Sequence, residues 1–209
     1  AEILQADLAP LLLELALWGV DDPAALSWID APPAGAMSQA RDLLQRLEAL
    51  DPNSHVTATG RRMAGLPVHP RLAHMLMRAS ETARLSHAAD LAALLSERDI
   101  FQRNSDDFRS RDLEHRLTAL AAWRRSGKRC AYPVDTHACQ RVEKVSRQLK
   151  SLTERIGTGA RASNLSTGSL VALAYPERVA QRRSTSAAGY LLANGRGAVL
   201  ADEDPLAGS

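Results

Sequence analysis

Two glycine-rich turns are the first candidates for phosphate chemistry in this sequence. A phosphate-binding loop ends in Gly-Lys-Ser/Thr, because backbone amides cradle the phosphates and the hydroxyl holds Mg²⁺. Gly127 and Lys128 come closest to this pattern, but Arg129 follows them and Ala122 stands where the leading glycine belongs. The second turn, residues 194–197, has no third glycine three residues later. Neither turn has the pattern of a nucleotide site.

Side chains that could hold a metal or transfer a proton are few and scattered. Cys130, His137 and Cys139 come nearest to a zinc site, but a spacing of two places His137 and Cys139 on different sides of a helix. Asp106 and Asp107 are paired carboxylates in a polar, arginine-containing segment, which is more typical of a solvated loop than of an acid–base pair. The other histidines are expected on helix surfaces and turns. The sequence therefore predicts no catalytic, cofactor-binding or metal-binding residue.

Basic residues, in contrast, are concentrated in one half of the chain. Residues 1–100 contain 8 Lys/Arg and 13 Asp/Glu, whereas residues 101–200 contain 18 Lys/Arg and 8 Asp/Glu. Clustered Lys and Arg release counterions when they meet phosphates, so this imbalance suggests a surface for a polyanion. A solvated face on long helices would explain the charge equally well.

Composition limits the fold class. The chain has 209 residues, of which 45% are hydrophobic and only 4% aromatic, and Ala and Leu dominate, so we expect a mainly α protein and exclude an all-β one. The longest apolar run, residues 8–20, contains Glu14 and is shorter than the roughly 20 residues of a membrane span. No signal peptide is visible, and two cysteines form no disulfide framework, so the prediction is a cytoplasmic protein without a membrane partner.

The periodicity of the first 60 residues predicts three helices and a small β element. The helices are expected over residues 7–18, 23–29 and 37–50, and a very short strand or hairpin over 55–60. The third helix has one buried face, which comprises Met37, Ala40, Leu43, Leu44, Leu47 and Leu50. Here and later in the chain, Trp18, Trp28 and Trp123 are expected to pack in the core rather than to stack on bases. This pattern is compatible with a winged helix, although a plain helical bundle would look the same.

The rest of the chain reads as further helices and a terminal hairpin. Helices are expected over 60–67, 70–80, 86–99 and 111–125, followed by a longest helix whose apolar seam is Val142, Val145, Leu149, Leu152 and Ile156. A final helix over 169–183 is interrupted at Pro176. Asn194 and Gly195 lie between short apolar runs and predict a β-hairpin. Because a lone hairpin is marginal in water, we expect this chain to be a piece of a longer protein.

Two groups of basic side chains are the candidate polyanion contacts. The first flanks the seam of the longest helix and comprises Arg141, Lys144, Arg147 and Lys150. The second comprises Arg178, Arg182 and Arg183, at the predicted end of the final helix. Spacings of four and five would allow the second group to present one basic edge. It could equally serve to complement the helix dipole.

Several segments together resemble the region that follows the two RecA-like motor domains in bacterial HrpB-type helicases of the DEAH/RHA family. The resemblance begins with residues 2–51, which contain the leucine-rich helix, the Asp-Ala-Pro-Pro turn and the Leu-Glu-Ala-Leu-Asp end. It continues through TATGRRMAGLPVHPRLAHML (57–76) and AALLSERD (92–99). The segments 172–183 and 190–200 are the part most specific to the HrpB subgroup.

The resemblance implies a domain order and a function. It implies a winged-helix domain over 1–67, a helical-bundle, ratchet-like domain over 68–187, and the start of a truncated OB-like β region over 188–209. The full-length protein would be an ATP-dependent, RNA-directed helicase, with ATP and Mg²⁺ bound by upstream motor domains that this fragment lacks. Its expected partners are those RecA-like domains and single-stranded nucleic acid, which the two basic groups would contact. The alternative is a helical scaffold for protein or interdomain contacts without direct nucleic-acid binding.

Overall fold

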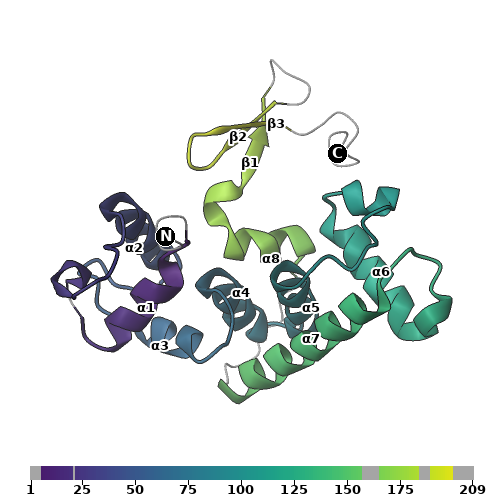
Figure 1. Cartoon of the computed structure of the whole chain (residues 1–209), viewed down its shortest axis with the longest axis horizontal. Coiled ribbons are helices and arrows are strands. Elements are labelled where there is room, and N and C mark those ends of the chain that lie inside the picture. Colours follow the sequence, from purple (N-terminus) through teal and green to yellow (C-terminus); the bar gives the residue numbers. More distant parts are fainter. Residues whose placement is uncertain (1–5, 21, 157–164, 184–188, 200–209) are drawn as a thin grey trace. The chain divides into compact units, whose positions relative to one another are not determined.

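The computed structural model of this chain describes residues 6–20, 22–156, 165–183 and 189–199 (Figure 1). Most described residues are helical, and a small antiparallel sheet follows the last helix, so the predicted mainly α class is confirmed. The chain divides into two compact units, Ala1–Met77 and Arg78–Ser209. No helix within the described ranges is both long and apolar enough to cross a bilayer.

The ends of helix α1 (Ala9–Leu17) in the first unit are set by the residues beside it. Asp7 accepts a hydrogen bond at 3.0 Å from the amide of Ala9, which satisfies one of the free donors of the first turn. At the other end Gly19 has φ +78°, the left-handed conformation that commonly closes a helix. Trp18, directly before Gly19, has 77% of its surface exposed, so the prediction that it packs in the core is wrong.

Helix α2 (Ala34–Arg46) begins and ends earlier than the predicted range 37–50. Its apolar face is nevertheless as predicted, and the following residues are all buried: Met37, Ala40, Leu43, Leu44, Leu47 and Leu50. Glu48 ends the helical path with φ +57°, and the chain then forms an antiparallel bridge between Leu50 and Val56. The apolar spacing therefore predicts burial correctly beyond the point at which the helix stops.

The short elements of the first unit are smaller than predicted. The expected helix over 23–29 is a single 3₁₀ turn, Pro23–Ala25, and the expected hairpin is only the bridge between Leu50 and Val56. Helix α3 (Ala58–Ala64) follows this bridge directly. A Cβ atom at Gly60 would lie 2.2 Å from the carbonyl oxygen of Ala49, so a glycine is required for α3 to approach the preceding turn.

Three helices of the second unit share one core. Helix α4 (Pro70–Ser80) contains the division between the units, and α5 (Leu85–Ser96), α6 (Leu113–Ser126) and α7 (Thr136–Ile156) follow it. Helix α7 packs mainly along α5 (Figure 1). The buried cluster of these helices and the segments between them comprises Ala93, Leu94, Ile100, Phe101, Ala119, Leu120, Cys139 and Val142.

The buried face of α7 only partly follows the predicted seam. Val142 and Leu149 are buried, whereas the remaining seam residues are half-buried: Val145, Leu152 and Ile156. An α-helix has 3.6 residues per turn, so a strict 3.5-residue seam rotates by about 20° per heptad away from a straight neighbour. Ser146 and Thr153 lie on the buried face instead, and the Thr153 hydroxyl donates at 2.7 Å to the carbonyl of Leu149.

An ionic network joins all three helices. Arg124 of α6 donates from Nη1 and Nη2 to the two carboxylate oxygens of Asp90 on α5, at 2.7 and 2.6 Å. Its Nε donates at 2.6 Å to Glu143 on α7, and Ser146 of α7 donates at 2.6 Å to Asp90. The hydrogen bonds to Asp90 are the main cause that raises the pKa of Arg124. Since the two carboxylate side chains are only 16% and 17% exposed, water replaces these contacts poorly.

The last helix is shorter than predicted. Helix α8 covers Thr167–Ala174, and the predicted continuation to residue 183 is wrong. Pro176 has no amide hydrogen and disfavours helical geometry at Tyr175, where φ is −131° and ψ is 58°. The chain instead forms a 3₁₀ turn, Pro176–Arg178, and then enters a strand.

The three strands form a meander, and the predicted hairpin is confirmed. Strand β1 (Ala180–Arg182) pairs antiparallel with β2 (Gly189–Leu192), and β2 pairs with β3 (Gly197–Val199). Gly195 has φ +81° in the turn between β2 and β3. Residues 200–209, the rest of the predicted β region, lie outside the described residues.

A histidine joins α8 to α5. Nε2 of His87 lies 2.7 Å from Oγ1 of Thr167, the buried first residue of α8. Burial disfavours the charged imidazole and, together with repulsion from Arg84, lowers the pKa of His87. The surroundings of His87 therefore favour the neutral imidazole.

Replacing Arg124 by Ala should lower the free energy of unfolding by about 2 kcal/mol, because Asp90 and Glu143 would lose their cationic partner in a partly buried position. The control is Arg125→Ala, which removes an exposed neighbour on the same helix and should change stability by no more than about 0.5 kcal/mol. Urea denaturation of both variants measures the difference. Equal losses would show that the network does not hold the helices together.

Acid should weaken the second unit through His87. The unfolded chain protonates this residue below its ordinary pKa of 6.5, whereas the folded protein holds it neutral to a lower pH, so stability is lost as pH falls below about 6.5. Thermal unfolding of the wild type and of His87→Gln at pH 7.5, 6.5 and 5.5 tests this. The wild type should lose more melting temperature than the variant, and parallel pH curves would contradict the assignment.

Candidate nucleic-acid interface

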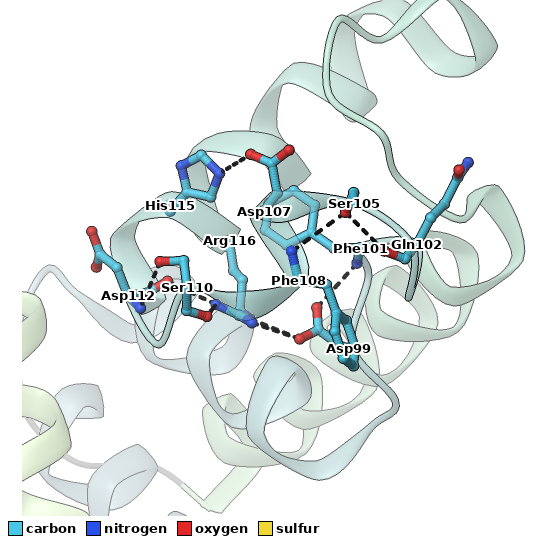
Figure 2. Close-up of polar contacts among 10 residues, drawn as sticks. All are labelled: Asp99, Phe101, Gln102, Ser105, Asp107, Phe108, Ser110, Asp112, His115 and Arg116. Atoms are coloured by element: carbon cyan, nitrogen blue, oxygen red, sulfur yellow. Dashed lines mark hydrogen bonds and ion pairs between the residues drawn. The ribbon is translucent and has the colours of Figure 1, made fainter. Parts of the chain in front are cut away.

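One of the two neighbouring carboxylates predicted from the sequence, Asp107, is hydrogen-bonded to a histidine (Figure 2). Asp107 does not face solvent as an open loop residue, because its Oδ1 lies 2.6 Å from Nε2 of His115 on α6. The His115 ring is held between two aromatic rings, with centroids 5.0 Å from Phe101 and 5.6 Å from Tyr132. The sequence gives no signal for this pair, since the two residues are eight positions apart across a loop and a helix start.

An ion pair between Arg116 and Asp99 lies where the segment before α6 begins and ends. Arg116 donates from Nε and Nη2 to Oδ2 of Asp99, at 3.1 and 2.6 Å. Its Nη1 donates to the carbonyls of Ser110 and Asp112, at 2.7 and 3.1 Å. These polar groups satisfy one another, and no hydroxyl or thiol nucleophile is hydrogen-bonded to His115 within the described part of the chain. The arrangement orders a loop and offers no catalytic constellation.

The cysteines do not form a metal centre in the described structure. Both Cys130 and Cys139 are free, and Cys139 is buried. Burial raises the pKa of Cys139 to about 12, so this thiol stays protonated at neutral pH and is a poor metal ligand. Among the residues with described positions, no group of three or more His, Cys, Asp or Glu side chains is arranged to hold a metal ion.

Of the predicted basic contacts on α7, Arg141, Lys144 and Arg147 are exposed to solvent and Lys150 is half-buried. Most of them have an acidic neighbour: Arg141 lies 3.7 Å from Glu97, Arg147 lies 2.5 Å from Glu143, and Lys150 lies 3.9 Å from Glu154. Lys144 is exposed and forms no ion pair with any described residue. Both side chains of the Lys150–Glu154 pair are about half exposed, and such a pair is worth about 0–1 kcal/mol, so a phosphate can displace it. Glu97 and Glu143 are only 28% and 17% exposed and hold their arginines more firmly.

These four side chains do not form a single stripe on α7. A spacing of three residues falls about 60° short of a full turn, so the positions from Arg141 to Lys150 wind around about half of the helix. Arg141 and Lys150 lie at opposite borders of the exposed face, whereas Lys144 and Arg147 lie on it. The central pair is therefore the better placed to meet one extended ligand.

The second basic group does not lie on a helix. Arg178 is in the 3₁₀ turn, Arg182 ends β1, and Arg183 follows directly, so both the helical edge and the helix-dipole role predicted for them are wrong. In a strand, neighbouring side chains point to opposite faces. Arg182 is the register partner of Tyr190 on β2. The Arg183 side chain lies over Gly197 of β3 instead, where a Cβ atom added to the glycine would be 3.7 Å from its Nη2.

The sheet carries a further basic group that is not among the predicted contacts. Arg196 is exposed in the turn between β2 and β3, and its amide donates at 3.0 Å to the side chain of Asn194. The turn motif predicts a backbone conformation and says nothing of the charge that the turn displays. Exposed basic side chains of the second unit thus include Lys144, Arg147, Arg178, Arg182, Arg183 and Arg196.

Comparison with known families matches both parts of this architecture. Residues 40–68 match the helicase-associated domain (HA2), winged-helix, and residues 69–148 match the helicase-associated domain (HA2), ratchet-like. The two matches lie in the order expected from the sequence.

Individual relatives extend the similarity along nearly the whole chain. The chain is 36% identical to the Escherichia coli ATP-dependent RNA helicase HrpB over 98% of its length, which is 22% of that protein. It is 33% identical over 60% of its length to the yeast (Saccharomyces cerevisiae) probable ATP-dependent RNA helicase DHR2, covering 17% of that protein. The chain thus spans about a fifth of the length of these relatives.

Solved structures show the same correspondence in three dimensions. The crystal structure of the E. coli DExH-box NTPase HrpB superposes with a TM-score of 0.70 at 34% identity, over 99% of this chain and 22% of that one. A second crystal structure, of the E. coli DEAH/RHA helicase HrpB, gives a TM-score of 0.67 at 36% identity, over 99% of this chain and 23% of that one. The chain therefore belongs to the helicase-associated (HA2) region of the DEAH/RHA helicases, with its winged-helix and ratchet-like domains.

Proposed function

We propose that this chain is the nucleic-acid-guiding accessory region of an ATP-dependent RNA helicase, and that it helps to form the channel for a single strand beside the RecA-like motor domains. ATP and Mg²⁺ would be bound and used by those motor domains, in the cytoplasm. The domain boundaries proposed are 1–67, 68–187 and 188–209. The family matches to 40–68 and 69–148 support the first of these boundaries.

The observation that carries this proposal is the exposure of the basic groups in the second unit. Lys144 and Arg147 lie on the open face of α7, and Arg182, Arg183 and Arg196 are exposed on the small sheet. Each such group that meets a phosphate releases condensed counterions, which supplies affinity without regard to base sequence. A helicase must move along any sequence, so contacts of this kind suit an accessory guide.

A scaffold role is the second candidate, and exposed apolar side chains of the first unit favour it. Trp18 is 77% exposed and Ile29 is fully exposed. Tryptophan is enriched in protein interfaces, where its large ring supplies contact area. The scaffold role predicts no salt-dependent binding of RNA, so one experiment separates the two candidates.

Neutralising four basic side chains of the second unit should weaken RNA binding. In the full 209-residue chain, Lys144→Gln, Arg147→Gln, Arg182→Gln and Arg183→Gln are combined, and binding of a fluorescent single-stranded RNA is measured at several salt concentrations. The slope of log K against log salt should fall by up to about 0.7 for each phosphate that the variant no longer neutralises.

The matched control neutralises two exposed arginines of the first unit, Arg46→Gln and Arg61→Gln. Its slope should stay close to that of the wild type. If the fourfold variant folds normally and keeps the wild-type affinity and slope, the basic groups are not the interface. If the wild type binds no RNA at low salt, the scaffold role is the better explanation.

A further inference from the structure

A cleft of about 520 Å³ opens within the second unit. Its walls are the first turn of α6 with the two preceding residues, the helix α8, and the segment from Tyr175 to Val179 that leads into β1. This volume lies within the range of about 300–1,000 Å³ that small-molecule sites occupy. None of the described basic residues of α7 or of the three strands lines the cleft. Of the polyanion contacts predicted from the sequence, Arg178 does.

The α8 wall is apolar and leaves space. Val171 and Ala172 line the cleft, and Gly168 faces it from the first turn of α8. A Cβ atom at Gly168 would meet only the Ser166 hydroxyl, at 3.9 Å. Glycine inside a helix costs about 0.5–1 kcal/mol relative to alanine, and no backbone approach at this position requires it. A larger side chain at this position would therefore have room to extend into the cleft.

Directly after α8, the wall of the cleft carries an aromatic ring with a guanidinium group over it. The guanidinium carbon of Arg178 lies 5.0 Å from the centre of the Tyr175 ring. Both residues line the cleft, and the Arg178 side chain is 66% exposed. Its Nε also lies 3.7 Å from Oε1 of Glu177, whose side chain is only 17% exposed, so this carboxylate balances part of the guanidinium charge. Aromatic rings and guanidinium planes are the surfaces on which unpaired nucleobases stack.

The charges at the cleft distinguish between the parts of a nucleotide. Asp112 and Glu114 line the α6 side, and Oδ1 of Asp112 already accepts the amide of Glu114 at 2.8 Å. Phosphates are disfavoured beside these carboxylates, whereas an uncharged base is not. The exposed cations Arg111 and Arg178 also line the cleft and are suited to the phosphates on either side of the base.

We propose that this cleft binds a nucleobase of a single strand, with the base against Tyr175, Arg178 and the apolar face of α8, and the adjoining phosphates against the two arginines. The inference rests on the proposed function and adds to it a base-binding site. It converts a purely electrostatic guide into one that also holds the strand through a stacked base, without reading its sequence.

The test compares two probes on the full chain. One is a fluorescent twelve-nucleotide oligouridylate, and the other is an abasic oligomer of the same length and charge. The wild type should prefer the oligouridylate. In Gly168→Leu, whose side chain fills the cleft, affinity for the oligouridylate should fall at least about fivefold, as expected for loss of one stacked base, while affinity for the abasic probe stays unchanged.

The matched control is Gly35→Leu, because Gly35 also lies in the first turn of a helix, α2, with nothing within 4 Å of its Cβ position. It should keep the wild-type preference. Tyr175→Leu removes the stacking ring and gives a second, independent loss of preference, and Gly168→Ala keeps the helix while filling less of the cleft. These variants keep the test decisive if Gly168→Leu fails to fold.

The outcomes separate the inference from the function on which it rests. If the wild type binds both probes equally, or if folded Gly168→Leu and Tyr175→Leu keep the preference, the base site is wrong and the electrostatic guide stands. In that case the cleft would be a candidate site for a peptide instead of a base. If the wild type binds neither probe, both the base site and the proposed function are wrong.

Discussion

The second unit depends on one guanidinium. Arg124 of α6 meets Asp90 of α5 and Glu143 of α7, so a single side chain determines how three helices lie against one another. A planar guanidinium offers donors in a fixed fork, which lysine cannot reproduce. Apolar packing can tolerate small slides between helices, but two paired carboxylates that are mostly withdrawn from water cannot be left without partners. The network therefore adds specific polar contacts to the apolar packing of α5, α6 and α7.

Helix α5 also contacts α8, one wall of the cleft. Three residues before Asp90, His87 reaches Thr167 and so ties the first turn of α8 to the same helix. At the other wall, Arg116 and Asp112 determine how α6 begins, through contacts with the loop that precedes it. Both walls of the cleft are thus held by polar contacts to a common scaffold. The proposed base site would benefit from walls that are positioned before the ligand binds.

The basic residues of the second unit fall into two groups, those paired with carboxylates between its elements and those exposed on its surface. Arg116 and Arg124 are committed to carboxylates inside the unit, although their charge alone would assign them to a polyanion surface. Lys144 and Arg183 remain exposed without an ion pair to the described residues. The excess of basic residues in the second half of the chain therefore serves two purposes. One part replaces apolar packing between helices, and only the remainder is available to phosphates.

What the sequence by itself determined was the buried face of α2 and the family that the chain resembles. The spacing of Leu43, Leu44 and Leu47 predicted burial even where the helix had ended, because burial follows the apolar side chain and not the hydrogen-bonding pattern. Local turn chemistry at Gly195 was equally readable. Only the tertiary structure decided that the chain after Pro176 becomes a strand, that His115 meets Asp107, and that Tyr175 and Arg178 line a cleft with α8. Strand pairing and side-chain partners depend on contacts between different elements, which leave no periodic signal in the sequence.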